Sequence, residues 1–292
     1  MKFYDEYAHD IAAAAQKTVL YEVAAAIKPG LVDRLGRGAH KDMDIFTFMA
    51  SASSIYRGMY GCALTGLNDG KDPFSLLEKI RPIGMDCEKS MLKATGGVNT
   101  HKGIIFSMGI LCAAAGSIYN EMPGEKIIKA EDTCTRAALI CRGLVEKDFS
   151  RIKEKANPTH GERLFMEYGI TGIRGEAQGG FRTVLEKGVA VLRNDGLRKS
   201  LSLNDLVLHT LMSIMTCCED TNVVIRGGLE GLKLVQKCAA EFMASGGMLS
   251  EDSKECLQEM DRLFVRKNLS PGGSADLLSL SLFLADMEGI SL

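Results

Sequence analysis

The chain has 292 residues, a formal net charge of −2 at neutral pH and 46% hydrophobic residues. It lacks the basic excess that a general nucleic-acid-binding surface needs, so we expect no nucleic-acid partner. Its length allows one large core, and no Pro/Ser-rich or low-complexity stretch interrupts it, which predicts a single domain over residues 1–292.

The first part of the chain has a helical pattern. Residues 11–27 are rich in helix formers and end at a Lys-Pro-Gly stop signal. Asp44 is placed to cap the next helix, and Asp72-Pro73 opens a third. We expect Pro82 to break this third helix, because proline removes a backbone donor.

A nearly all-apolar helix follows, for which Thr100 or Asn99 is the expected cap. Because it is apolar nearly all round, we place this helix in the centre of the core. Residues 132–149 predict one further amphipathic helix, and Thr159 with Glu162 has the spacing of a capping box.

The last part of the chain continues this pattern. Ser250 is the expected cap of a helix over residues 251–267, and Ser270-Pro271 introduces the final helix. No set of alternating strands bounded by hairpin turns is found. The prediction is therefore an all-α fold, a single compact domain of about ten helices with a loop-lined active-site cleft.

Cysteine usage and the N-terminus bear on the compartment. The nine cysteines are scattered, only Cys217 and Cys218 are adjacent, and no Cys-x-x-Cys zinc pair occurs. The chain start lacks the basic and apolar runs of a signal peptide, and we expect no stretch of membrane-spanning length. These features predict reduced core cysteines and a cytoplasmic protein without membrane association.

Five stretches combine glycine with a high density of charged and hydroxyl side chains: residues 28–44, 95–103, 159–175, 219–228 and 268–276. Helix connections alone do not need this density. It predicts polar loops that form the mouth of a site on a rigid helical body.

The first stretch, KPGLVDRLGRGAHKDMD, mixes acidic and basic side chains. Carboxylates can bind Mg²⁺, and cationic side chains can bind the phosphates of a nucleotide. The alternative is a solvated loop whose charges pair with one another. The candidate phosphate-binding residues are Lys28, Arg34, His40 and Lys41, and the candidate metal ligands are Asp42 and Asp44.

The second stretch, TGGVNTHKG, is typical of an anion-binding helix start, where free backbone N–H groups and the positive end of the helix dipole meet a ligand. The alternative is a glycine C-cap followed by an N-cap. His101 could orient a substrate hydroxyl or phosphate, or be structural. The candidate binding residues are Gly96, Gly97, Asn99, Thr100 and Lys102.

The third and fourth stretches carry more carboxylates. Around the Gly169–Gly175 turn, helix-surface ion pairs are the structural alternative to a site. Glu219 and Asp220 can hold a hydrated divalent cation, with Asn222 beside them and Arg226 as a phosphate clamp. The alternative is a helix C-terminus that ends in an Asx turn. Two acidic side chains at a helix C-terminus interact unfavourably with the helix dipole, so this position would favour a compensating cation.

The fifth stretch contains SPGGSAD, a glycine-rich helix start. Such a start could bind an anion or permit close packing. The candidate binding residues are Gly272, Gly273 and Ser274.

Taken together and in this order, KPGLVDRLGRGAHKDMD, TGGVNTHKG, HGERLFMEYGITGIRGEA, EDTNVVIRGG and LSPGGSADLL resemble the triphosphoribosyl-dephospho-coenzyme A synthase family. That family makes the prosthetic-group precursor of citrate lyase and malonate decarboxylase. The resemblance covers the chain from its first helix nearly to its end. It implies an enzyme that joins a ribose hydroxyl of 3′-dephospho-coenzyme A to C1′ of the ribose of ATP, releases adenine and keeps the triphosphate.

The resemblance also implies roles for the candidate residues. ATP and 3′-dephospho-coenzyme A would be the substrates and Mg²⁺ the cofactor, a holo-acyl-carrier-protein synthase would use the product, and a homodimer is left open. Mg²⁺ would be held by Glu219 and Asp220, with Asp42 or Asp44. The phosphate-binding cations would be Lys28, Lys41, Lys102, Arg174 and Arg226, and the general base Glu176 or Glu167.

Replacement of Asp220 by Asn is expected to reduce turnover greatly and leave the fold intact. Two alternatives to the transferase use the same residues. A magnesium-dependent nucleotide or ADP-ribose hydrolase would release adenine or phosphate without an acceptor. A nucleotide-binding sensor would bind ATP tightly with magnesium and form no product.

Overall fold

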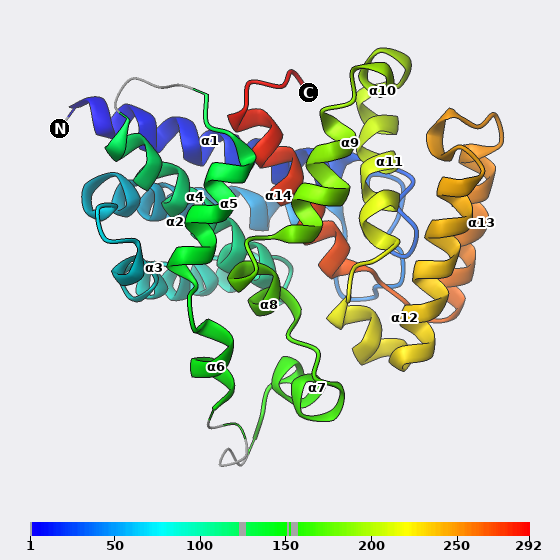
Figure 1. The fold of residues 1–292 in the computed structure, drawn as a ribbon. Coiled ribbons are helices and arrows are strands. Elements are labelled where there is room, and N and C mark those ends of the chain that lie inside the picture. Colours follow the sequence, from blue (N-terminus) through cyan, green and yellow to red (C-terminus); the bar gives the residue numbers. More distant parts are fainter. Residues whose placement is uncertain (1, 123–126, 151, 153–156) are drawn as a thin grey trace.

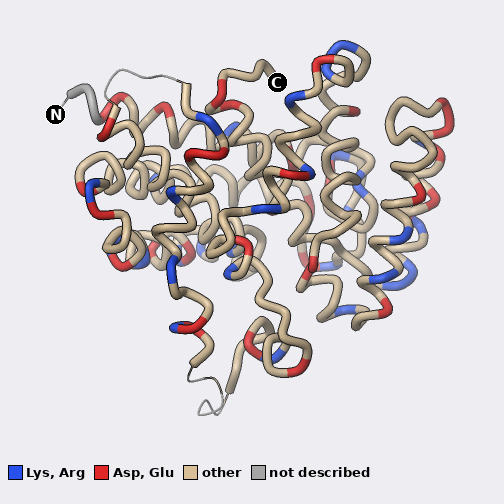
Figure 2. The backbone as a smooth tube through the Cα atoms, in the orientation of Figure 1, with Lys and Arg blue, Asp and Glu red and all other residues tan. Residues whose placement is uncertain are grey.

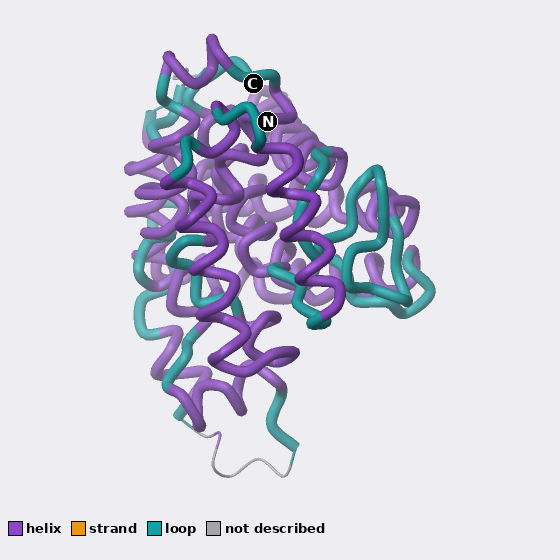
Figure 3. The backbone as a smooth tube through the Cα atoms, turned by 90° about the vertical axis from the view of Figure 1, so that its right-hand side faces the viewer, coloured by secondary structure: helices purple, strands orange, loops and turns teal. Residues whose placement is uncertain are grey.

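The computed structural model describes residues 2–122, 127–150, 152 and 157–292, so part of the 120–130 connection lies outside the described residues. Helices form all the regular secondary structure of this described part, as Figure 1 and Figure 3 show. The all-α prediction is confirmed. The first five helices are α1 (Lys2–Ala24), α2 (Ile45–Asp69), α3 (Pro73–Ala94), α4 (Lys102–Glu121) and α5 (Ala130–Ile140).

Short helices fill the middle of the chain: α6 (Leu144–Phe149), α7 (His160–Tyr168), α8 (Gly172–Gln178), the π-helix η2 (Val184–Val189), α9 (Ala190–Leu192) and α10 (Asp195–Ser200). The chain then forms α11 (Leu203–Met215), α12 (Thr221–Ala244), the 3₁₀ turn η3 (Gly247–Leu249), α13 (Ser253–Arg266) and α14 (Gly272–Met287). The described residues thus contain fourteen α-helices, more than the ten expected, because several connections are themselves helical.

Helix α4 lies in the core, as its all-apolar pattern predicts. It packs against α1, α2, α3, α5 and α14. Of the described helices, α4 alone is long and apolar enough to cross a membrane, which corrects the expectation that no stretch would be, yet 83% of its apolar window is buried inside the protein. This burial is that of a core helix.

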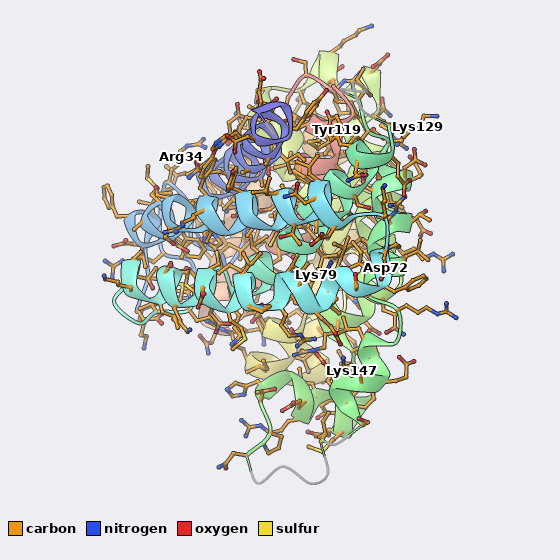
Figure 4. All side chains as sticks on the ribbon, turned by 90° about the vertical axis from the view of Figure 1, so that its left-hand side faces the viewer. Arg34, Asp72, Lys79, Tyr119, Lys129 and Lys147 are labelled. Carbon is orange, nitrogen blue, oxygen red and sulfur yellow. The ribbon has the colours of Figure 1, made fainter. Side chains whose placement is uncertain are left out.

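Helices α2 and α4 pack closely against each other. A Cβ atom on Gly66 would lie 2.1 Å from the carbonyl oxygen of Ala113, and one on Gly116 would lie 2.3 Å from that of Ala63. The two backbones therefore touch where only glycine fits. Figure 4 shows α2 and α3 side by side on this half of the molecule, and both contact α4.

Most predicted helix starts are confirmed. Asp44 caps α2 in a capping box with Thr47, and Pro73 opens α3 behind Asp72. The capping box of Thr159 is also present, at the start of α7. These caps depend on sequence-local hydrogen bonds, which explains why the sequence alone predicts them.

Five expectations about helix limits were wrong. The helix expected over residues 11–27 spans Lys2–Ala24, and the N-cap of α4 is His101, not Thr100 or Asn99. Pro82 lies inside a continuous α3, and its exposure to solvent lets water satisfy the carbonyl group that proline leaves free. The helix expected over residues 132–149 is divided at Gly143, which adopts a left-handed φ of 75°. Ser250 ends the η3 turn, and α13 begins three residues later, at Ser253.

The charged residues and the thiols can be compared with two further expectations. Lys, Arg, Asp and Glu are interspersed along the chain in Figure 2, with no face of one sign in that view. All nine cysteines are free, but only six of them are buried. Cys217 and Cys256 are exposed and Cys238 is half-buried, so the core position expected for all nine was wrong for these three.

Candidate active site

All five glycine-rich stretches meet at one cleft, which consists of two adjoining cavities. We call the narrower one, of about 140 Å³, the inner cavity, and the wider one, of about 640 Å³, the outer cavity. Residues 28–44 reach only the inner cavity and residues 159–175 only the outer one, whereas the other three stretches line both. The residues that line both cavities are Asn99, Lys102, Gly103, Asn222 and Asp276.

Three long helices begin at this cleft. The first residues of α4, α12 and α14 all line it, so the positive ends of three helix dipoles gather there. No side chain caps His101, the residue before α4, although the Asn99 Oδ1 accepts the Lys102 N–H at 3.3 Å. Gly103 and Ile104 follow in the first turn and line the inner cavity, so the free backbone N–H groups of this helix start face a space that an anion could occupy.

Asp220 joins two of these helix starts. It is the N-cap of α12, not part of a helix C-terminus, so its charge is favourable to the dipole and needs no compensating cation. One carboxylate oxygen accepts the N–H groups of Asn222 (3.0 Å) and Val223 (3.3 Å), and the other accepts the Ser274 N–H (2.7 Å) and Oγ–H (3.0 Å). Asp220 is 1% exposed. The geometry therefore gives Asp220 and Ser274 structural contacts.

An Asp220→Asn variant is accordingly expected to lose about 1–3 kcal/mol of unfolding free energy, because the amide nitrogen cannot accept hydrogen bonds and leaves buried donors unpaired. Urea denaturation measures this loss. Glu219→Gln is the matched control, since Glu219 is exposed and has no side-chain partner in the described structure. Wild-type stability together with lost turnover in Asp220→Asn would instead support the original metal-ligand role.

The four predicted metal ligands do not come together. No group of three His, Cys, Asp or Glu side chains within the described ranges could hold a metal ion. Asp44 caps α2 and pairs with Arg37 at 3.0 Å, and Asp42 is exposed and lines neither cavity. Glu219 lines the outer cavity. A magnesium ion that arrives with a triphosphate needs only one or two protein carboxylates, so Glu219 fits that requirement best.

Asp276 is a site residue that the sequence reasoning did not single out. Its carboxylate lies between the two cavities and has no hydrogen-bond or ion-pair partner among the residues that the structure describes. Burial, and then the negative charges of Asp220 and Glu22, raise the pKa of Asp276 well above its ordinary value. A Cβ atom on Gly103 would lie 2.0 Å from Asp276 Oδ2, so the carboxylate needs glycine at that position.

His101 is held in the inner cavity by a short hydrogen-bond chain. Thr100 Oγ1 donates to Ser51 Oγ (2.7 Å), and the Ser51 hydroxyl lies 2.6 Å from His101 Nδ1. Burial, with a smaller effect of the Lys28 charge, lowers the pKa of His101 to about 3, so the ring is neutral. Since the Ser51 hydroxyl already accepts from Thr100, we assign it as the donor to Nδ1, which puts the ring proton on Nε2, an atom that is buried without a partner in the described structure.

The inner cavity also contains predicted phosphate-binding residues. Arg226 donates to the carbonyl oxygen of Ala39 (3.0 Å) and lies 3.2 Å from His40 Nδ1. The other ring nitrogen of His40 lies 2.8 Å from Ser270 Oγ. Burial and the charge of Arg226 lower the pKa of His40. These contacts hold the Arg226 guanidinium at the cavity wall.

The glycines of the fifth stretch permit close packing. A Cβ atom on Gly272 would lie 2.9 Å from Asn222 Nδ2, and one on Gly273 would lie 3.1 Å from the Asp220 carboxylate. Both glycines line the cleft, Gly272 the inner cavity and Gly273 the outer one. Close packing, one of the two roles expected for these glycines, is therefore present, and it occurs at the wall of the cleft.

Two predicted phosphate-binding residues of the first stretch lie outside the cleft. Lys28 is 1% exposed, and its ammonium group donates to the Glu22 carboxylate and to the Glu22 carbonyl oxygen (2.7 Å). Arg34, which is labelled in Figure 4, donates to the carbonyl oxygen of Ala24 (2.5 Å) and to Asn204 Oδ1 (2.8 Å). Lys28 thus links the loop after α1 back to that helix, and Arg34 links the end of α1 to Asn204 of α11.

Other predicted residues also lie outside both cavities. Arg174 donates to Asp148 (2.8 Å) and stacks over Phe149, which agrees with the ion-pair alternative. Glu167 is exposed on α7, and Lys41 is exposed in its loop. Glu176, in contrast, lines the outer cavity.

The glycine pair of the second stretch forms the end of α3. Gly96 and Gly97 have left-handed φ values of 65° and 94°, and the Gly97 N–H donates to the Leu92 carbonyl oxygen at 2.7 Å. This is the C-cap geometry of the structural alternative. Neither glycine lines a cavity.

Comparisons with known proteins extend over nearly the whole chain. Residues 8–291 match the family model described as ATP:dephospho-CoA triphosphoribosyl transferase. A 2-(5''-triphosphoribosyl)-3'-dephosphocoenzyme-A synthase of Klebsiella pneumoniae is 39% identical over 279 residues, 95% of this chain and 91% of the relative. A probable synthase of the same name from Albidiferax ferrireducens is 40% identical over 278 residues, 94% of this chain and 89% of the relative. No solved structure matches the chain.

Proposed function

Because the chain belongs to the ATP:dephospho-CoA triphosphoribosyl transferase family, we propose that it joins the triphosphoribosyl part of ATP to 3′-dephospho-coenzyme A and releases adenine. The observation that carries this proposal is the meeting of all five stretches at one cleft with two adjoining cavities. A transfer between two nucleotides requires both to be held with their reacting atoms in contact. Two cavities that share a wall supply that arrangement.

The reaction exchanges one bond at C1′ of the ATP ribose. The bond from C1′ to adenine breaks and an acceptor ribose oxygen forms a new bond to C1′. The hydroxyl proton passes to a base, and the departing adenine takes up one proton, so that it is released as neutral adenine. Glu176 is the better of the two candidate bases, because it lines the outer cavity whereas Glu167 does not. Burial raises the pKa of Glu176, and its carboxylate accepts hydrogen bonds from Thr183. A raised pKa suits a general base at neutral pH.

We place the triphosphate of ATP at the start of α4. Lys102, at the wall common to the two cavities, and Arg226, in the inner one, supply positive charge beside the free N–H groups of that helix start. Glu219 would hold a magnesium ion bound to the triphosphate. When bound, the ion would neutralise phosphate charge.

A Lys102→Ala variant is expected to raise the KM for ATP about 10-fold or more, which corresponds to one charged hydrogen bond to phosphate. Lys102 Nζ pairs with Glu88 at 2.5 Å and is more than half exposed, so its removal should leave the fold intact. Lys41→Ala is the matched control, because Lys41 is exposed and lies outside both cavities. Equal effects of the two substitutions in steady-state kinetics would contradict this phosphate site.

The family assignment supports finer proposals about partners. The product serves the prosthetic group of citrate lyase or malonate decarboxylase and is used by a holo-acyl-carrier-protein synthase. We place the enzyme in the cytoplasm. Mass spectrometry tests the activity itself: the joined product must have the mass of 3′-dephospho-coenzyme A plus triphosphoribose, less water.

A further inference from the structure

We propose that the inner cavity binds the adenine base that leaves ATP, through a hydrogen-bond donor at His101 Nε2 and an acceptor at the Asp276 carboxylate. The inference rests on the proposed function, since it assigns one of the two substrates to one of the two cavities. It rests on the volume of the cavity, its walls and these two unpaired polar groups.

The inner cavity suits a planar aromatic base. A protein cavity of about 150 Å³ with apolar walls accepts a ring such as benzene, and the inner cavity has about 140 Å³ and opens beside the outer one. Its apolar wall residues are Leu31, Val32, Met43, Phe48, Ile104 and Ala275. Phe48 also packs edge-on against the His101 ring, with centroids 5.1 Å apart, which holds the imidazole in place.

The polar groups match the edge of adenine that bears N6 and N7. That edge offers one donor, the N6 amino group, beside one acceptor, N7. His101 Nε2–H is a buried donor that lacks a partner, and the half-buried Asp276 carboxylate is an acceptor to which no described residue donates. A ligand that accepts from His101 Nε2 removes the cost of leaving this buried donor unpaired.

The sizes of the two cavities decide which adenine binds here. In ATP the leaving base is bonded directly to the carbon that the acceptor attacks, and the two cavities share a wall, so a base in the inner cavity keeps C1′ beside an acceptor in the outer one. Dephospho-coenzyme A, with its long pantetheine arm, needs the wider cavity.

A donor at N7 would assist the reaction as well as binding. Adenine gains negative charge on its imidazole ring as the bond to C1′ breaks, and a fixed donor there stabilises that charge. The Ser51 hydrogen bond holds the His101 proton on Nε2. Neutral His101 acts here as a hydrogen-bond donor.

The test is equilibrium binding of free adenine and of 7-deazaadenine, which lacks the N7 acceptor, to the full-length protein by calorimetry. We expect wild-type protein to bind adenine about 10-fold or more tightly than 7-deazaadenine, the value of one hydrogen bond to an otherwise unpaired buried group. His101→Phe should bind the two bases equally. Purine, which lacks the N6 amino group, should bind more weakly than adenine to wild type but not to Asp276→Leu.

The controls keep this test separate from that of the proposed function. His160→Phe is the matched control, because His160 is exposed on α7 and lines neither cavity. His101→Gln keeps a donor and should retain a preference for adenine if His101→Phe does not fold. Equal binding of adenine and 7-deazaadenine by wild type, or an unchanged preference in folded His101→Phe, would overturn the inference even if the enzyme makes the joined product. Adenine selectivity in a protein that makes no such product would support this base site and contradict the proposed function.

Discussion

A Gly103→Ala variant is expected to lose at least about 100-fold in kcat/KM, the typical effect of moving a reacting group by an ångström. The added methyl carbon would lie 2.0 Å from Asp276 Oδ2, so the carboxylate must leave its place between the two cavities. Stability should not fall in parallel, because alanine favours a helix over glycine by about 1 kcal/mol. Steady-state kinetics and thermal unfolding of the same preparation separate the two effects.

Gly84→Ala is the matched control for this variant. Gly84 lies inside α3, and a Cβ atom there would meet nothing within 4 Å. It should keep wild-type turnover and gain a similar helix preference. Near-normal turnover in Gly103→Ala would show that the reaction does not depend on the present position of Asp276.

A Lys28→Met variant is expected to lose about 3–5 kcal/mol of unfolding free energy, because removal of one partner leaves the Glu22 carboxylate buried and unpaired. Both side chains of this pair are almost fully buried. Replacing both, as in Glu22→Leu with Lys28→Met, should restore much of the loss, since apolar side chains can substitute for a buried ion pair. Urea denaturation of the single and double variants measures the difference.

Arg34→Met controls for the loss of one positive charge from the same loop. Arg34 is exposed, so its variant should lose far less stability than Lys28→Met. A stable Lys28→Met protein with weakened ATP binding would contradict the buried pair and return Lys28 to the phosphate site that its sequence position indicated.

Local features of the fold were predictable because they depend on neighbouring residues. The capping boxes of Asp44 and Thr159 are set by side chains three positions apart, and the central place of α4 follows from its apolar surface. The meeting of the five polar stretches was also expected. The break predicted at Pro82 was wrong because the presence of proline does not tell whether water can hydrogen-bond the carbonyl group, four residues earlier, that proline leaves without a donor.

The roles of individual charges could not be predicted, because they depend on tertiary contacts. The residues around Lys28 have the composition of a surface loop. Only the folded structure shows that the Lys28 ammonium group donates to the Glu22 carboxylate. The position of Asp220 was assigned to the wrong helix end, although an Asp followed by Thr-Asn-Val-Val is also a helix start. Asp276 was not predicted as a site residue. Its lack of a hydrogen-bond partner among the described residues and its contact with Gly103 depend on the packing of the folded chain, which the sequence does not show.

The most direct measurement is the ratio of free adenine to joined product when purified protein acts on ATP and magnesium, with and without 3′-dephospho-coenzyme A. A transferase with both substrates in adjoining cavities should form adenine and product in equal amounts, and release almost no adenine without the acceptor. Adenine release that does not depend on the acceptor would contradict the transfer and indicate a hydrolase. Tight ATP binding without either product would indicate a sensor.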